Sequence, residues 1–214
     1  MKKNLKFILI ITFLIFIYTF ICAYNYVYAV STNLSDSVFR LHIIANSDSK
    51  EDQDLKYIVR DNLIQYMVKL CENCSSKTEV IEIAKNNISN FKQIAEDTVK
   101  EQGFSYDVNV EIGNFEFPTK SYGDISFPAG YYDALKVKIG NSSGQNWWCV
   151  MFPPLCFVNT TTGLVPTESK ENLEENLSDE GYKIVSDSDN SNIAFKFKII
   201  EFFENTGLIT AKKW

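Results

Sequence analysis

The stretch "FRLHIIANSDSKEDQDLKYIVRD", residues 39–61, contains two different hydrophobic periods in succession. At its start, apolar Leu41 and Ile43 alternate with polar Arg40 and His42, which predicts a β-strand. The serines and aspartates that follow are typical of a helix N-terminus. Apolar residues then return at three- and four-residue steps, at Leu55, Ile58, Val59, Leu63, Tyr66, Met67 and Leu70. The stretch therefore predicts a strand followed by a helix with one buried face.

The same periods continue along the chain. A second helix is predicted from about residue 78 to residue 101, with Gly103 as its stop signal. Strands are predicted where apolar and polar residues alternate, at 104–117, 131–140 and 146–152. The segment "GNSSGQ" between the last two strands is typical of a turn that joins them as a hairpin. We therefore expect an α+β fold, with two packed helices on an antiparallel or mixed sheet.

The N-terminus has the pattern of an export signal or a membrane segment. Three lysines lie within the first six residues, and an uncharged run continues to Asp36. The apolar part up to Cys22 is short for a membrane span, but its continuation to residue 30 makes it long enough. Val27-Tyr28-Ala29 is a poor cleavage site. We favour a cleaved signal peptide over an anchor that keeps residues 1–30 in the membrane, and both over a lipid on Cys22.

Composition and charge limit the functions and the domain organisation that the rest of the chain can have. With 45% hydrophobic residues among 214, the protein can bury a core, and its net charge of −6 without a Lys/Arg cluster disfavours nucleic-acid binding. We expect a core domain at 36–164. Residues 165–192 are strongly acidic and are interpreted as a solvated linker or insertion. They lead to a C-terminal segment, 193–214, for which a helix is favoured over a strand.

The cysteines suit an exported protein. Besides Cys22 the chain has Cys71, Cys74, Cys149 and Cys156, an even number. Three interpretations remain open, in this order of preference: disulfides, free thiols and a zinc site. The zinc site comes last, because Cys149 and Cys156 form a poor zinc knuckle. The favoured pairing is Cys71 with Cys74 and Cys149 with Cys156. We expect no metal site and no cofactor.

Catalytic machinery is not visible in the sequence, so we expect no catalytic residues and no enzyme activity. His42 is the single histidine, and the usual hydrolase, metalloprotease, nucleotide-binding and aspartic-protease motifs do not occur. The alternative is a cell-wall hydrolase that uses Asp48, Asp54 or Asp61 near His42. The polar residues Asn46 to Ser49 are better explained as a helix cap than as a cation loop. Arg40, His42 and Asn46 are expected to pair with charged residues of the following helix.

Two aromatic stretches are candidates for a partner-binding surface. "NWWCVMFPPLCF", residues 146–157, has no charge, and its two prolines stiffen a loop that carries apolar side chains. "YGDISFPAGYY", residues 122–132, has similar chemistry. Large rigid side chains of this kind dominate binding energies in interfaces. The predicted contact residues are Tyr131, Trp148, Leu155 and Phe157.

Three stretches together carry a family resemblance. They are "FRLHIIANSDSKEDQDLKYIVRD", "FPTKSYGDISFPAGYYDALKVKIG" and "NWWCVMFPPLCF", in that order. Between about residues 38 and 157 the chain resembles the stage II sporulation protein R family. The resemblance implies a protein made in the forespore and exported into the intermembrane space. It also implies that the protein activates a membrane-embedded aspartic protease, which leads to processing of an early mother-cell sigma factor precursor. A cell-wall hydrolase and a membrane-tethered scaffold remain the alternatives.

Overall fold

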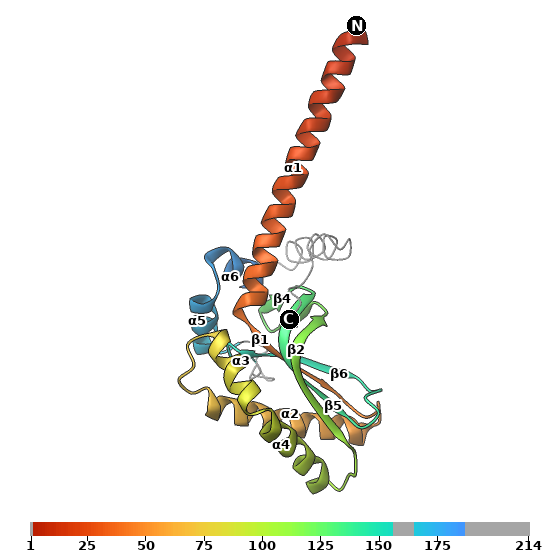
Figure 1. Ribbon diagram of the computed structural model, residues 1–214, viewed down its shortest axis with the longest axis vertical. Coiled ribbons are helices and arrows are strands. Elements are labelled where there is room, and N and C mark those ends of the chain that lie inside the picture. Colours follow the sequence, from red (N-terminus) through yellow and green to blue (C-terminus); the bar gives the residue numbers. More distant parts are fainter. Residues whose placement is uncertain (1, 156–164, 187–214) are drawn as a thin grey trace.

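Strand β1 lies at the centre of the fold. The computed structural model describes residues 2–155 and 165–186 (Figure 1). A four-stranded sheet has the order β2-β5-β1-β6, in which β1 is parallel to β5 and antiparallel to β6, and β3 pairs with β4 in a separate hairpin. The sheet is therefore mixed, within the expected α+β class. The strands are β1 (Phe39–Ile44), β2 (Val108–Phe117), β3 (Lys120–Tyr122), β4 (Ile125–Phe127), β5 (Gly130–Ile139) and β6 (Asn146–Phe152).

The two helices predicted from the apolar period are present, and the second of them is interrupted once. Ser49 caps α2 by accepting a hydrogen bond from the backbone N–H of Asp52, which confirms the capping interpretation. The predicted helix 78–101 is two helices, because the backbone turns at Asn87, whose N–H bonds to the carbonyls of Ile83 and Ala84. The helices are α1 (Lys2–Ser37), α2 (Lys50–Leu70), α3 (Lys77–Asn86), α4 (Ile88–Glu101), α5 (Thr167–Asn176) and α6 (Asp179–Ser186).

The predicted hairpin between β5 and β6 is wrong, because β1 lies between these strands. The connecting residues instead bind the segment that joins β1 to α2. The N–H of Gly144 bonds to the Ala45 carbonyl, and the N–H of Gln145 bonds to the Asp48 carboxylate at 2.7 Å. The connection is thus held across the end of β1, and β1, with five of its six residues buried, takes the inner position.

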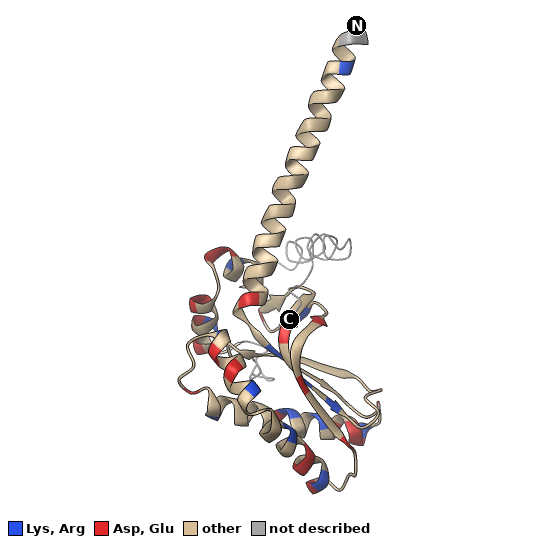
Figure 2. Cartoon of the chain, in the orientation of Figure 1, with Lys and Arg blue, Asp and Glu red and all other residues tan. Residues whose placement is uncertain are grey.

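Helix α1 is longer than the predicted N-terminal segment and joins the core at its end. It is the one helix in the described part of the chain that is long and apolar enough to cross a membrane. Figure 2 shows no charged residue along most of its length, and large apolar side chains from Leu5 to Ile21 are exposed. Its last turns differ, because Val27, Val30 and Leu34 are buried among the core residues. The helix therefore combines a membrane-type segment with a structural part of the domain.

The part of residues 165–192 that the structure describes packs on the core, which contradicts a solvated linker but not the other interpretation, an insertion. Residues 167–176 and 179–186 form α5 and α6, and Leu173, Ile184 and Val185 are buried in the core. Few apolar residues suffice here, because these helices bury only a narrow stripe. The domain thus extends beyond residue 164. Residues 156–164 and 187–214, which include the whole predicted C-terminal segment, lie outside the described residues.

Candidate functional site

The two faces of the sheet differ in what they carry. Trp147 contacts Tyr57 and Arg60 of α2, so its side chain lies on the helix-covered face. Trp148 follows it in β6 and points to the other face, because successive side chains of a strand alternate. There Trp148 pairs with His42 of β1. We call this the polar–aromatic face; it is built by Arg40, His42, Phe117, Tyr132 and Trp148.

Arg40 is the most unusual residue of the polar–aromatic face. Its side chain is fully buried, and its guanidinium carbon lies 4.2 Å from the ring centre of Phe117 and 4.7 Å from that of Tyr132. Nη2 donates a hydrogen bond to the Tyr122 hydroxyl at 2.7 Å, which ties the β3–β4 hairpin to the sheet. Nε and Nη1 have no hydrogen-bond partner among the residues that the structure describes. Aromatic ring faces thus supply most of the compensation for this buried cation.

The expected pairing of the β1 polar residues with helix α2 is largely wrong, for a geometric reason. Arg40 and His42 lie on the face opposite α2, so its charged residues are out of their reach. Asn46, beyond the end of the strand, does reach the helix and donates a hydrogen bond to Asp52 at 2.8 Å. Arg60 pairs instead with its neighbour Asp61 at 2.7 Å.

His42 is held neutral by its surroundings. Its ring stacks on Trp148 with 3.7 Å between ring centres, and Nε2–H donates to Asn146 Oδ1 at 2.7 Å. The pKa of His42 is lowered from its ordinary value of 6.5 to about 4. Burial is the largest cause, the nearby cations Lys136, Lys138 and Arg40 act in the same direction, and the Asn146 hydrogen bond opposes them. A neutral, stacked imidazole supports a structural role.

This environment predicts an acid-dependent loss of stability. A folded-state pKa near 4 means that the unfolded chain binds the proton more tightly than the folded chain does. The contribution of neutral His42 to the free energy of unfolding is therefore fully present above pH 6.5 and is lost as pH falls toward 4. The difference between the folded-state and unfolded-state pKa values corresponds to about 3 kcal/mol of unfolding free energy. We expect the gap in unfolding free energy between wild type and His42→Gln to narrow across this window. Urea unfolding at several pH values measures it, and a constant gap would contradict the assignment.

The three predicted partner-binding residues that the structure describes do not form one surface. Tyr131 is 46% exposed, but its place in β5 puts it on the face opposite Trp148. Trp148 is half-buried between His42 and Phe117. Leu155 is 1% exposed and belongs to the core, which leaves it no surface for a partner. Phe157 lies outside the described residues. Of the three that are described, Tyr131 is the one whose side chain is exposed.

The favoured cysteine pairing is wrong for Cys71 and Cys74. Cys71 and Cys74 are free, so the predicted bond between them is not formed. They lie in one turn, where the N–H of Cys74 bonds to the Cys71 carbonyl at 3.1 Å. Burial, together with the hydrogen bond that the Cys71 thiol makes with the side chain of Cys74, raises the pKa of Cys71 to about 12. Cys149 is disulfide-bonded, and Cys156 lies outside the described residues.

The aspartates of the hydrolase alternative do not converge on His42. Asp48 accepts the backbone N–H of Gln145, and Asp54 pairs with Lys50 at 2.7 Å. Asp61 pairs with Arg60, on the helix-covered side of the sheet. Within residues 2–155 and 165–186, no group of three or more His, Cys, Asp or Glu is arranged to hold a metal ion.

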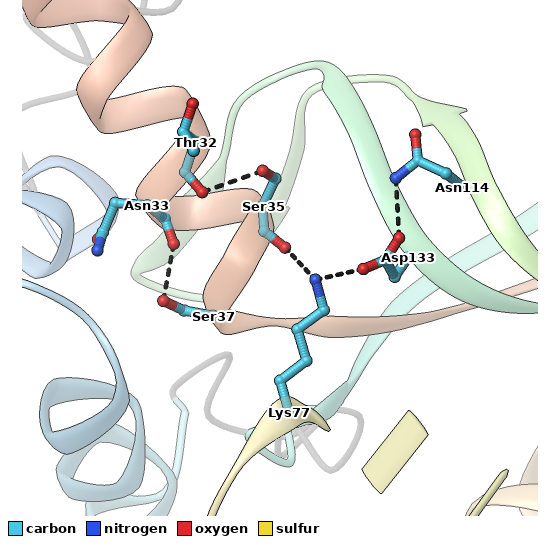
Figure 3. A network of polar contacts seen from close by, with 7 residues as sticks. All are labelled: Thr32, Asn33, Ser35, Ser37, Lys77, Asn114 and Asp133. Atoms are coloured by element: carbon cyan, nitrogen blue, oxygen red, sulfur yellow. Dashed lines mark hydrogen bonds and ion pairs between the residues drawn. The ribbon is translucent and has the colours of Figure 1, made fainter. Parts of the chain in front are cut away.

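A buried polar network fixes the end of α1 to the domain (Figure 3). Lys77 Nζ, at the start of α3, forms an ion pair with Asp133 of β5 at 2.5 Å, and the two side chains are only 10% and 13% exposed. The same ammonium donates to the Ser35 carbonyl of α1 at 2.5 Å, and Asn114 of β2 donates to Asp133 at 2.9 Å. The network thus joins four elements, α1, α3, β2 and β5, and no pattern in the sequence predicts it.

A second contact of α1 holds the C-terminal helices. Asn33 Oδ1 accepts hydrogen bonds from the backbone N–H of Ser178 at 3.2 Å and from its hydroxyl at 2.9 Å. Ser178 in turn accepts a bond from the N–H of Gly181 in the first turn of α6. The membrane-type helix and the last described helix are therefore parts of one fold.

These features define a class: an α+β domain joined without a break to one apolar N-terminal helix of membrane-spanning length. The sequence profile of the family described as "Stage II sporulation protein R (spore_II_R)" matches residues 35–162. The chain belongs to this family, which gives it a role in sporulation. The match begins at the end of α1 and takes in every strand of the mixed sheet.

A curated relative supports the assignment. The chain is 36% identical over 138 residues to "Stage II sporulation protein R" of Bacillus subtilis (strain 168). The matched part covers 64% of this chain and 62% of that relative. No solved structure matches. The chain thus spans about three fifths of the relative's length, and the polar–aromatic face lies within the part matched by the family profile.

Proposed function

We propose that this protein is an exported signalling ligand of the forespore that activates a membrane-embedded aspartic protease, which then processes an early mother-cell sigma factor precursor. The observation that supports this most is the family match over residues 35–162, in a domain continuous with an apolar helix that can insert in a membrane. The protein acts by binding and supplies no chemistry of its own.

The position of α1 bears on where the signal works. Tyr24, Tyr26 and Tyr28 lie between the exposed apolar turns and the buried end of the helix, and tyrosines favour the membrane–water interface. With the apolar turns in the forespore membrane, the domain faces the intermembrane space next to the bilayer surface. A protease embedded in the facing membrane is then within reach of the domain, at a high local concentration.

Co-expression in a non-sporulating host tests this function. We expect the sigma factor precursor to be cut only when the full chain and the candidate protease are both present. Tyr131→Ala removes an exposed ring and is expected to lower activation about thirtyfold if that ring is a hot spot of about 2 kcal/mol, with unchanged melting. Tyr131→Phe keeps the ring and should activate like the wild type. Cutting without the full chain would rule out the proposed function.

A further inference from the structure

A cavity of about 510 Å³ lies at the end of α2, away from the polar–aromatic face. Its walls come from the last turns of α2, the turn that holds Cys71 and Cys74, the end of β6 with Pro153 and Pro154, and one side of α5. This volume is within the range of ordinary ligand sites. The cavity therefore joins parts of the chain that are far apart in sequence.

The inner lining of the cavity is apolar. Ile64, Met67, Val80 and Met151 line it and are buried. Val68 also lines it but is 45% exposed, which places an apolar side chain in contact with solvent. Two methionines among these residues make the lining adaptable, because the thioether side chain is unbranched and flexible.

The charged residues of the cavity are all acidic. Glu72, Glu168 and Glu175 line it and are exposed, and no Lys or Arg is among the described lining residues. Glu168 and Glu175 lie seven residues apart on α5, which places them on one side of the helix. Glu171 and Glu174 are on the same helix and are exposed too, but they do not line the cavity.

We propose that this cavity binds a basic, amphipathic segment of the membrane protein that the chain activates. The inference rests on the proposed function and adds a surface and a chemistry to it. Apolar side chains of the segment would enter the lining, and the aliphatic stems of its Lys or Arg residues would lie along it with their charged ends at the glutamates. Phosphate groups and anionic lipids are excluded by the same carboxylates.

Charge reversal on α5 and the neighbouring turn provides a matched test. Full-length Glu72→Lys/Glu175→Lys is compared with Glu171→Lys/Glu174→Lys, which changes the net charge equally at exposed positions outside the cavity. In the co-expression assay we expect the first variant to cut at least about tenfold less sigma factor precursor, because both charge contacts become repulsive, and the second to match the wild type. Equal activity of the two variants overturns the proposal. If the first variant accumulates poorly, Glu72→Gln/Glu175→Gln replaces it, with a smaller loss expected and the same criterion.

A photo-crosslinking residue in place of Val68 identifies the occupant. We expect a crosslink to a segment of the candidate protease that is rich in Lys or Arg and apolar residues. Crosslinks only to residues 187–214 of the same chain, only to a second copy, or to nothing overturn the proposal. The two proposals can fail separately, because a crosslink to the protease without sigma factor processing removes the proposed function but supports the docking site.

Discussion

Replacing Lys77 with methionine is expected to destabilise the domain by about 3–5 kcal/mol, the usual result of removing one partner of a buried ion pair. Lys77 and Asp133 are nearly buried, so the Asp133 carboxylate would lose its ammonium in a place where water cannot replace it. The contact with the Ser35 carbonyl would be lost as well, which loosens the end of α1. Urea unfolding of the wild type and the variant measures the difference.

Lys92→Met is the matched control. Lys92 makes an i,i+4 pair with Glu96 at 3.7 Å, and its side chain is 51% exposed. Such exposed pairs contribute about 0.5 kcal/mol or less. The double variant Lys77→Met/Asp133→Asn removes both charges and is expected to recover part of the loss. A Lys77→Met protein as stable as Lys92→Met would show that the network of Figure 3 does not hold the domain together.

Removing the end of α1 is the second change with a large expected effect. A chain that starts at Tyr24 keeps Val27, Val30 and Leu34, whereas a chain that starts at Val38 loses all three from the core. At roughly 1.5–3 kcal/mol for each buried aliphatic side chain, the shorter chain loses on the order of 5 kcal/mol. This is comparable to the whole stability of many domains. We expect the chain from Tyr24 to unfold cooperatively and the chain from Val38 to be largely unfolded.

This experiment also bears on processing of the N-terminus. Cleavage after Ala29 would remove Val27 but leave Val30 and Leu34 in the core. A chain that starts at Val30 is therefore expected to be folded, with a stability between the other two. Circular dichroism and urea unfolding of the three chains give the order. Equal midpoints for all three would contradict the view that α1 ends inside the domain.

The sequence was sufficient for elements with a strong local period. The strand and helix of residues 39–61 appear as β1 and α2, and Ser49 caps the helix as expected. Alternation also located β2, β5 and β6. Strand order was not predictable, because the position of β1 between β5 and β6 depends on backbone contacts of residues 140–145 that have no sequence signal. Local patterns fix the elements, and nonlocal contacts fix their neighbours.

The candidate sites were harder to predict for a related reason. Trp148 and Leu155 were expected on a surface because they lie in an uncharged aromatic stretch, but Trp148 stacks on His42 and Leu155 is buried. Burial depends on the whole fold rather than on neighbours in sequence. The two helices in residues 165–192 were not predicted, because the segment is acidic and α5 buries a single apolar side chain, that of Leu173. One buried apolar residue gives no helical period in the sequence. The docking cavity combines α2, β6 and α5, which no single pattern relates.

Reconstitution from purified components is the decisive test of whether this protein activates the protease by binding. The candidate protease is placed in liposomes with the sigma factor precursor, and the full-length protein is added in matching liposomes or detergent. If the protein is an activating ligand, cutting begins only after its addition, and its rate saturates with the protein's concentration. Cutting at the same rate without the protein, or no cutting at any concentration although both proteins are folded, would contradict the account.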